Sequence, residues 1–189
     1  MTVTDDVTGT GTGPVVELEF ATSDSRLPCV AATEAEECVL ELAELFPRSD
    51  GEYAEFFHVT GIGSERVLEL AGTYQTIDVT LLREYEEGAL FEFATTGDCP
   101  AYALAELGAL PREATSVDGE ARIVAELPSQ FEPSLVVDEF LDGRPDARLV
   151  SKQERENFSP FFSQSSLEQL LHEHLTDRQR EVLRAAFDA

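Results

Sequence analysis

Residues 112–127 read REATSVDGEARIVAEL, and this stretch decides the fold that the sequence predicts. Asp118-Gly119 lies between two runs in which apolar and polar residues alternate, which is a strong hairpin signal. Alternation with a period of two places the apolar side chains on one face of a strand. We therefore expect a β-hairpin here, within a sheet that buries one face.

The same alternation predicts further strands on both sides of this hairpin. A second hairpin is expected at residues 77–96, where Glu87-Gly88 joins its two strands. Helices are expected where Ser64 can cap a first turn, and where Pro100 and Pro133 can begin one. The expected strands are 15–20, 38–46, 52–59, 77–85, 89–96, 112–117, 120–127 and 147–153, and the expected helices are 64–71, 100–109 and 133–142. Residues 38–46 are also compatible with a helix, and the stop at Phe46-Pro47 favours the strand.

This order is one strand, then two strands and a helix three times, then a last strand. We interpret it as an α+β fold, an antiparallel sheet with helices on one face built from ferredoxin-like ββα repeats, spaced about 40 residues apart. A C-terminal helical segment is expected to follow. The expected domains are a disordered lead-in at 1–14, an α+β regulatory or sensing domain at 15–154, a connector at 155–166, and a helical segment at 167–189.

The charge balance is the strongest compositional signal, because 38 acidic residues face 13 basic ones and the formal net charge is −25. Self-repulsion of this size is suppressed in molar salt, where the screening length falls to about 3 Å. A hydrophobic content of 42% argues for a packed core and against a disordered acidic chain. We expect a folded halophilic protein.

The tail differs in charge from the rest of the chain. Residues 1–150 carry 31 acidic and 8 basic side chains, whereas residues 151–189 carry 7 and 5. Phosphate would be repelled by the first region more strongly than by the second. DNA is therefore expected only at the tail.

The compartment is expected to be the cytoplasm. The sequence has no apolar run of about 18 residues, and its N-terminal MTVTDDVTGTGTGP lacks the pattern of a secretory signal. The three cysteines show no paired spacing, which argues against a disulfide framework or a zinc site. No membrane partner and no cofactor are expected.

Candidate catalytic residues are few. His58 lies in an expected strand, with no nucleophile motif nearby in the sequence. His172 and His174 are two positions apart, so a helix would point them to different sides, away from a shared metal. Cys99 precedes Pro100 at a helix start, where it would be either a reactive thiol or a small capping residue; the second role is favoured. We expect no enzymatic activity.

The stretch LTDRQREVLRAAFDA at residues 175–189 indicates an amphipathic helix. Thr176 to Gln179 matches the S/T-x-x-E/Q capping box, so the helix is expected to begin at Asp177. One face of this helix is apolar, and the arginines lie off it. The apolar residues are Val182, Leu183, Ala186 and Phe187, and the arginines are Arg178, Arg180 and Arg184.

This stretch resembles the opening helix of the Bat-type (bacterio-opsin activator) helix-turn-helix domain of haloarchaeal transcription regulators, whose pattern is L-T-x-R-Q-x-E-x-L-x-x-A. Residues 91–128, FEFATTGDCPAYALAELGALPREATSVDGEARIVAELP, resemble the α+β domain that commonly precedes it. The resemblance implies transcription regulation, with the α+β domain sensing a signal or forming a dimer. It also implies that Val182, Leu183, Ala186 and Phe187 form the helix-turn-helix core.

A helix-turn-helix reads bases with its second helix, and these residues resemble only the first. The resemblance therefore implies that Arg178, Arg180 and Arg184 contact at most the DNA backbone. We expect a DNA-binding domain that is incomplete in this chain, so that DNA is a partner only through a missing C-terminal part. The chain as it stands would then not bind DNA specifically.

Other functions stay open at this point. The chain would be a stand-alone interaction protein if its C-terminal amphipathic helix pairs with a partner or with itself. A small enzyme on a ferredoxin-like sheet is less well supported, because no catalytic constellation is evident. A homodimer is expected, since such regulators match two-fold operators, and an unknown small-molecule ligand is left open.

Overall fold

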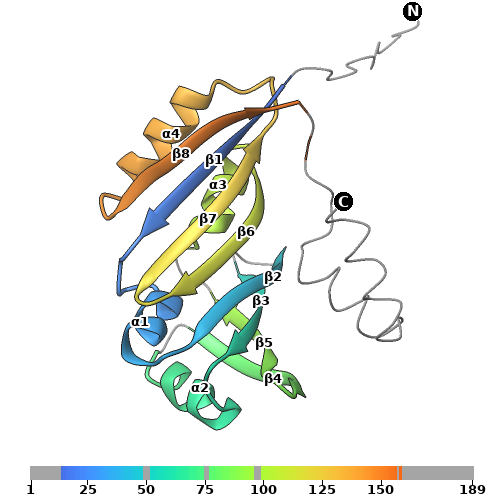
Figure 1. Cartoon of the computed structure of the whole chain (residues 1–189), viewed down its shortest axis with the longest axis vertical. Helices are drawn as coiled ribbons and strands as arrows, with labels where there is room; N and C mark the ends of the chain where they lie inside the picture. Colours follow the sequence, from blue (N-terminus) through green and yellow to red (C-terminus); the bar gives the residue numbers. More distant parts are fainter. Residues whose placement is uncertain (1–13, 49–51, 75–76, 96–98, 157, 159–189) are drawn as a thin grey trace, which may run out of the picture. The chain divides into compact units, whose positions relative to one another are not determined.

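The structure is a computed structural model that describes residues 14–48, 52–74, 77–95, 99–156 and 158. Contacts divide the chain into two compact units. The described residues of unit 1 lie within Met1–Glu37 and Asp98–Phe158, and those of unit 2 lie within Cys38–Gly97. We describe each unit by itself (Figure 1).

Unit 1 is a four-stranded antiparallel sheet in the order β6-β7-β1-β8. Three helices, α1, α3 and α4, belong to the same unit. The elements are β1 (Val15–Thr22), α1 (Pro28–Ala35), α3 (Pro100–Glu106), β6 (Leu110–Val117), β7 (Glu120–Leu127), α4 (Pro133–Asp142) and β8 (Ala147–Arg155).

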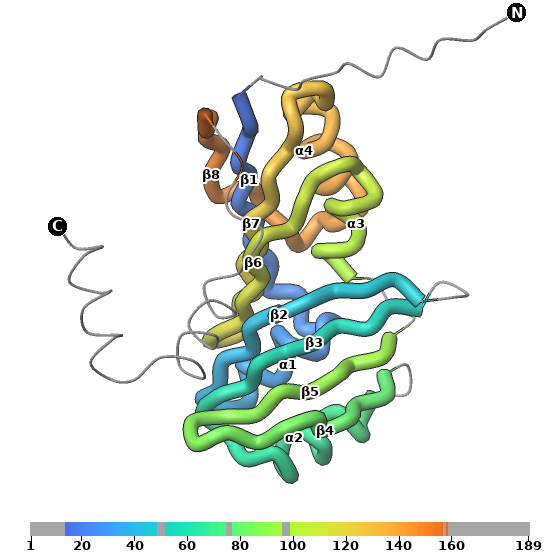
Figure 2. The backbone as a smooth tube through the Cα atoms, turned by 90° about the vertical axis from the view of Figure 1, so that its right-hand side faces the viewer, coloured from blue at the N-terminus to red at the C-terminus, as the bar shows by residue number. Residues whose placement is uncertain are grey.

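The core of unit 1 lies between the sheet and helices α3 and α4, which cover one face of it (Figure 2). Leu18 and Phe20 of β1 point to this face, because alternate residues of a strand share a side. The Phe20 ring packs against Phe140 of α4 with ring centroids 4.5 Å apart, and Leu104 of α3 is fully buried beside them. This burial fixes both helices on the sheet.

Helix α1 is attached to the β6–β7 hairpin by buried polar contacts. The Thr33 hydroxyl lies 3.0 Å from the Ser116 hydroxyl, which also donates to the Cys29 carbonyl. The Gly119 amide in the hairpin turn donates to Thr33. Buried hydroxyls need such partners, so these bonds set the position of α1 on the hairpin.

Unit 2 is also a four-stranded antiparallel sheet, with strand order β4-β5-β3-β2 and one helix, α2, in the described part. Its elements are β2 (Val39–Pro47), β3 (Tyr53–Thr60), α2 (Ser64–Ala71), β4 (Ile77–Tyr85) and β5 (Gly88–Thr95). Phe57, Val59, Phe91 and Phe93 share one buried face of this sheet. Helix α2 lies on that face, where the Ser64 hydroxyl donates to Glu84 of β4.

The hairpin at residues 112–127 is confirmed. Asp118 and Gly119 have φ values of 49° and 74°, so both occupy the left-handed region that a two-residue type I′ turn requires. Asparagine, aspartate and glycine tolerate this region better than other residues. The Asp-Gly pair therefore sets the register that places Val117 opposite Glu120.

The predicted fold class is wrong. A ferredoxin-like unit over Tyr53 to Val117 requires β6 in the strand position next to β3, but β2 occupies that position and β6 pairs with β7 in a hairpin. Short loops cost less closure entropy than long ones, which favours the three hairpins β2–β3, β4–β5 and β6–β7. The described residues form eight strands, which pair in antiparallel hydrogen-bonded sheet structure, and four short helices. They do not form the predicted ferredoxin-like ββα repeats. The predicted C-terminal helical segment lies outside the described residues.

The two units share a strand arrangement that the sequence does not reveal. In each, a hairpin (β2-β3 or β6-β7) is followed by a helix (α2 or α4) and an edge strand (β4 or β8). The strand between hairpin and edge strand is β5 in unit 2 and the N-terminal β1 in unit 1. Ser64 and Pro133, which begin α2 and α4, are 69 positions apart, so the expected 40-residue repeat has the wrong period.

Individual elements differ from the prediction in three places. Helix α1 was not expected; Pro28 begins it after Leu27, which makes no side-chain cap. Gly63, and not Ser64, is the N-cap of α2. Helix α3 begins at Pro100 as predicted but ends at Glu106, before Gly108 with a φ of 87°.

Candidate functional site

The candidate site residues taken from the sequence are those of the C-terminal stretch. They lie outside the described residues, so their roles stay predictions. They are Arg178, Arg180 and Arg184 for DNA backbone contact, and Val182, Leu183, Ala186 and Phe187 for the helix-turn-helix core. The candidate surfaces described below all belong to the two units.

Unit 2 presents an aromatic face on the side of its sheet opposite to α2. Phe46 of β2 and Phe56 of β3 form an edge-to-face pair with centroids 5.9 Å apart, and Phe46 is 53% exposed. Leu90 of β5 lies opposite His58 in register, and the His58 ring lies 5.9 Å from that of Tyr85. A half-exposed cluster of this kind is typical of a binding surface, because single exposed apolar residues are normal but contiguous ones are not.

Acidic side chains border part of this aromatic face. Glu41 pairs with His58 in register, and both Glu44 and Glu92 lie opposite Phe56. Glu92 forms an ion pair with Arg48 at the end of β2. The rim is therefore acidic on the β2 side, at Glu41 and Glu44, whereas on the β4 side Arg83 lies opposite Leu90 and over the Tyr85 ring.

A hollow of about 490 Å³ lies at one end of unit 2. It is lined by the β3–α2 loop and by the β4–β5 turn, comprising residues 61–64 and 84–88. Three of its lining side chains are Glu84, Glu86 and Glu87, so an anionic ligand would meet like charges. The hollow suits a neutral or cationic group better than a phosphate.

Unit 1 carries a ladder of ion pairs on the sheet face opposite to its helices. Arg122 of β7 lies 2.9 Å from Glu19 of β1 and also contacts Glu120, which accepts from Arg148 of β8. Hydrogen bonds from Arg148 and Arg122 hold the pKa of Glu120 below its ordinary value. The arginine side chains are about half exposed, so each pair adds little stability alone.

Among the described residues of unit 1, Arg112 and Glu126 form a buried ion pair. Arg112, at the bulge of β6, donates from Nε to Glu126 of β7 at 2.6 Å. The Glu126 side chain is fully buried and that of Arg112 is 14% exposed. The guanidinium also lies over the ring of Phe158, 5.9 Å from its centroid. This contact positions the chain after β8 against β6.

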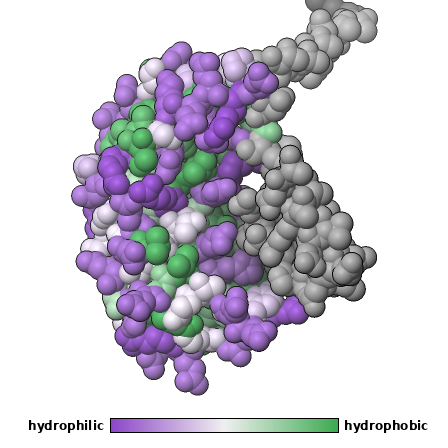
Figure 3. Space-filling model, viewed as in Figure 1, coloured by the Kyte–Doolittle hydropathy of each residue, from purple (hydrophilic) through white to green (hydrophobic). Residues whose placement is uncertain are grey.

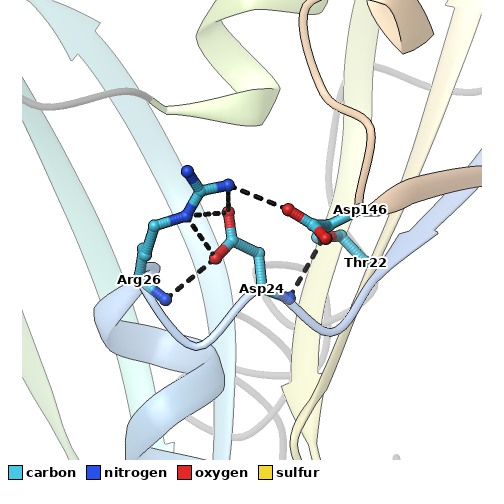
Figure 4. Close-up of polar contacts among 4 residues, drawn as sticks. All are labelled: Thr22, Asp24, Arg26 and Asp146. Carbon is cyan, nitrogen blue, oxygen red and sulfur yellow. Dashed lines mark hydrogen bonds and ion pairs between the residues drawn. The ribbon is translucent and has the colours of Figure 1, made fainter.

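An exposed cluster of charged side chains joins the β1–α1 loop and the α4–β8 loop of unit 1 (Figure 4). Arg26 donates from Nε and its terminal nitrogen to both oxygens of Asp24, and it bonds Asp146 in the α4–β8 loop at 2.9 Å. The bonds from Arg26 hold the pKa of Asp24 below its ordinary value of 3.8. The cluster fastens the β1–α1 loop to the start of β8.

Cys99 is a capping residue in the structure. Its sulfur accepts a hydrogen bond from the Tyr102 amide at 3.3 Å and the residue is 8% exposed. This agrees with the favoured role as a buried cap. Within the residues that the structure describes, no group of three or more His, Cys, Asp or Glu side chains is arranged to hold a metal.

Hydrophilic residues predominate on the face drawn in Figure 3, and apolar residues form small separate patches there. Among the helices of the described ranges, none combines the length and hydrophobicity needed to cross a bilayer.

Comparison with known families decides the relationship of this chain. A protein-family model described as BAT, the GAF and HTH_10 associated domain, matches residues 14–160. The chain belongs to the BAT family. The match includes β1 to β8 and confirms the resemblance to Bat-type regulators that residues 91–128 indicated. Comparison with curated proteins finds no match.

The surfaces of the BAT domain were not found from the sequence. The aromatic face had a usable signal, since EYAEFFHV at residues 52–59 is apolar in both phases of the strand, as in a strand covered on both sides. The buried pair of Arg112 and Glu126 had no usable signal in the sequence. The β6 bulge that directs Arg112 to Glu126 cannot be predicted from the alternation of apolar and polar residues.

Proposed function

We propose that this BAT domain is the regulatory part of a DNA-binding transcription regulator. The observation that carries the proposal is the family match over residues 14–160, since the family is described as associated with GAF and HTH_10 domains. The C-terminal stretch supports it independently, because residues 175–189 resemble the first helix of a helix-turn-helix.

The regulatory role is sensing, dimerisation or both. The hollow of unit 2 would admit a small neutral or cationic group, and the aromatic face would admit a protein segment. A homodimer matches the two-fold symmetry of most operators. Sedimentation in molar KCl tests this part, and a monomer at every concentration would contradict it.

The 189 residues alone are proposed to lack sequence-specific DNA binding. Residues 177–187 resemble a helix that crosses the DNA backbone, and such a helix does not read bases. In a fluorescence anisotropy titration at moderate salt, we expect weak binding that does not depend on sequence. Nanomolar binding to one sequence would show that the chain contains a complete reader.

We also propose that the protein acts by binding and not by catalysis, in a salt-rich cytoplasm. The net charge of −25 supports the second point, because screening by molar salt relieves repulsion. Far-UV circular dichroism between low and molar KCl is expected to show structure gained with salt. A fold equally stable without salt would contradict the halophilic assignment.

The regulatory function is tested by transcript profiling in the native cells. Deletion of the coding region is expected to change a defined set of transcripts, and the intact gene is expected to restore them. A variant with Leu104→Asp, which places a charge at a fully buried core position, should fail to restore them. Unchanged transcripts after deletion would contradict the proposed function.

A further inference from the structure

The aromatic face of unit 2 is a docking surface without an assigned occupant. Its centre is the Phe46–Phe56 pair, and its rim contains Glu41 and Glu44. Phe46 is the more exposed ring, at 53%. A segment that fits must bring an apolar stripe to the rings and positive charge to the rim.

The overall charge of unit 2 limits which kinds of partner can bind the aromatic face. Its described residues include eleven acidic and three basic side chains, and one of the basic residues, Arg48, already pairs with Glu92. Nucleic acids and acidic proteins would therefore be repelled. A second copy of this chain would also bring a strongly negative surface, because its net charge is −25.

The C-terminal stretch of the same chain has the required pattern. At about 100° per residue, an α-helix from Asp177 would place Val182, Leu183, Ala186 and Phe187 on one stripe. Arg180 and Arg184 would border this stripe on one side and Arg178 on the other. The acidic residues Asp177, Glu181 and Asp188 would lie on the opposite face, away from the glutamates of the sheet.

The arginines of this stretch complement the glutamates at the rim of the aromatic face. The rest of the chain does not, because acidic side chains outnumber basic ones there. Arginines beside an apolar stripe would meet Glu41 and Glu44, while the stripe would cover Phe46 and Phe56. Both partners belong to one chain, so docking is intramolecular and benefits from a high effective concentration.

We propose that the amphipathic segment at residues 177–187 docks on the aromatic face of unit 2. The contact covers the apolar face with which a first helix packs against the rest of a helix-turn-helix. The docked state is thus an autoinhibitory contact. This consequence rests on the proposed regulatory function, whereas the docking itself does not.

Hydrogen–deuterium exchange on the full 189-residue chain in molar KCl tests the docking. Amides of residues 178–187 are expected to be protected relative to a synthetic peptide of residues 175–189, because short isolated helices are marginal in water. Phe46→Asp changes only the sheet, and it is expected to lower this protection at least about tenfold, the effect of ~1.4 kcal/mol. Exchange in β3 and β5 should stay unchanged.

Leu135→Asp is the matched control. Leu135 is 67% exposed on α4 of unit 1, so its replacement also adds a charge at an exposed apolar position, but in the unit that does not contain the aromatic face. It should leave the protection of residues 178–187 intact. Equal loss in both variants, or no loss with Phe46→Asp, would overturn the proposal.

Charge reversal gives a second, independent measurement. Arg180→Glu with Arg184→Glu should lower the protection, and adding Glu41→Arg with Glu44→Arg should restore part of it. No restoration would contradict a direct contact between the two sets. Protection that rises with protein concentration would assign the surface to a second copy instead, and would overturn the intramolecular contact.

The two proposals can fail separately. Docking without any transcript change on gene deletion would retain the contact and reject the regulatory function. Transcript changes with an unprotected tail would retain the regulatory function and reject the contact.

Discussion

Replacement of Arg112 by methionine should destabilise unit 1 more than any other loss of a single ion pair described above. The change leaves the Glu126 carboxylate, which is fully buried, without the guanidinium 2.6 Å away. Breaking a buried ion pair by removing one partner typically costs about 3–5 kcal/mol. Methionine keeps much of the aliphatic volume, so lost packing adds little.

The double variant Arg112→Met, Glu126→Met separates charge from shape. Replacing both members of a buried pair by apolar residues is often neutral, so the double variant should recover most of the lost stability. Arg122→Met is the matched control. It removes a half-exposed arginine from the same sheet face, and it should lower the free energy of unfolding far less than Arg112→Met does.

Urea unfolding at constant molar KCl measures these differences by circular dichroism, and hydrogen exchange in β6 and β7 assigns the loss to unit 1. The difference in free energy of unfolding between Arg112→Met and Arg122→Met should persist as the salt concentration is raised, because salt screens buried ion pairs less than exposed ones. Equal costs for the two single variants would refute the reasoning. A double variant as unstable as Arg112→Met would show that side-chain shape, and not charge, matters at this position.

Three further changes test the fold. Phe140→Ala should cost about 3–5 kcal/mol in urea unfolding, because it opens a cavity beside the ring of Phe20, and a near-neutral result would contradict the described core. Gly108→Ala should lower the free energy of unfolding by about 1–3 kcal/mol, because φ is 87° and an added Cβ would lie 2.3 Å from the ring of Phe131. Unchanged stability would exclude that backbone conformation at Gly108. The lowered pKa of Asp24 contributes stability above its unfolded value near 3.8, and this is lost as pH falls through the still lower folded value. Arg26→Gln should therefore reduce stability at neutral pH, with the difference from wild type vanishing in acid; a difference that grows in acid would contradict the assignment.

The local elements of this fold are readable from the sequence, because they depend on short-range physics. Asp118-Gly119 favours the left-handed turn of the β6–β7 hairpin, and Pro100 and Pro133 begin helices where their missing amide costs nothing. Helix α1 has a weaker signal, since its N-cap is Leu27, which cannot accept a capping bond.

The arrangement of strands is not readable in the same way. Alternation in β3 is compatible with β2 or β6 as its neighbour, and only the pairing shows that β2 takes that position. The insertion of the N-terminal β1 between β7 and β8 joins residues more than 100 positions apart, such as Phe20 and Ile123. The aromatic face depends on the same pairings, because Phe46, Phe56 and Leu90 come from three strands.

The central claim is that this BAT domain regulates transcription through the state of its tail. The most direct measurement compares transcript profiles of cells that carry the wild-type gene, the deletion and Phe46→Asp. We predict that Phe46→Asp and the deletion change the same transcripts, and in opposite directions, because under the proposed docking the variant would release the tail from the aromatic face. Identical profiles in the three strains would contradict the account.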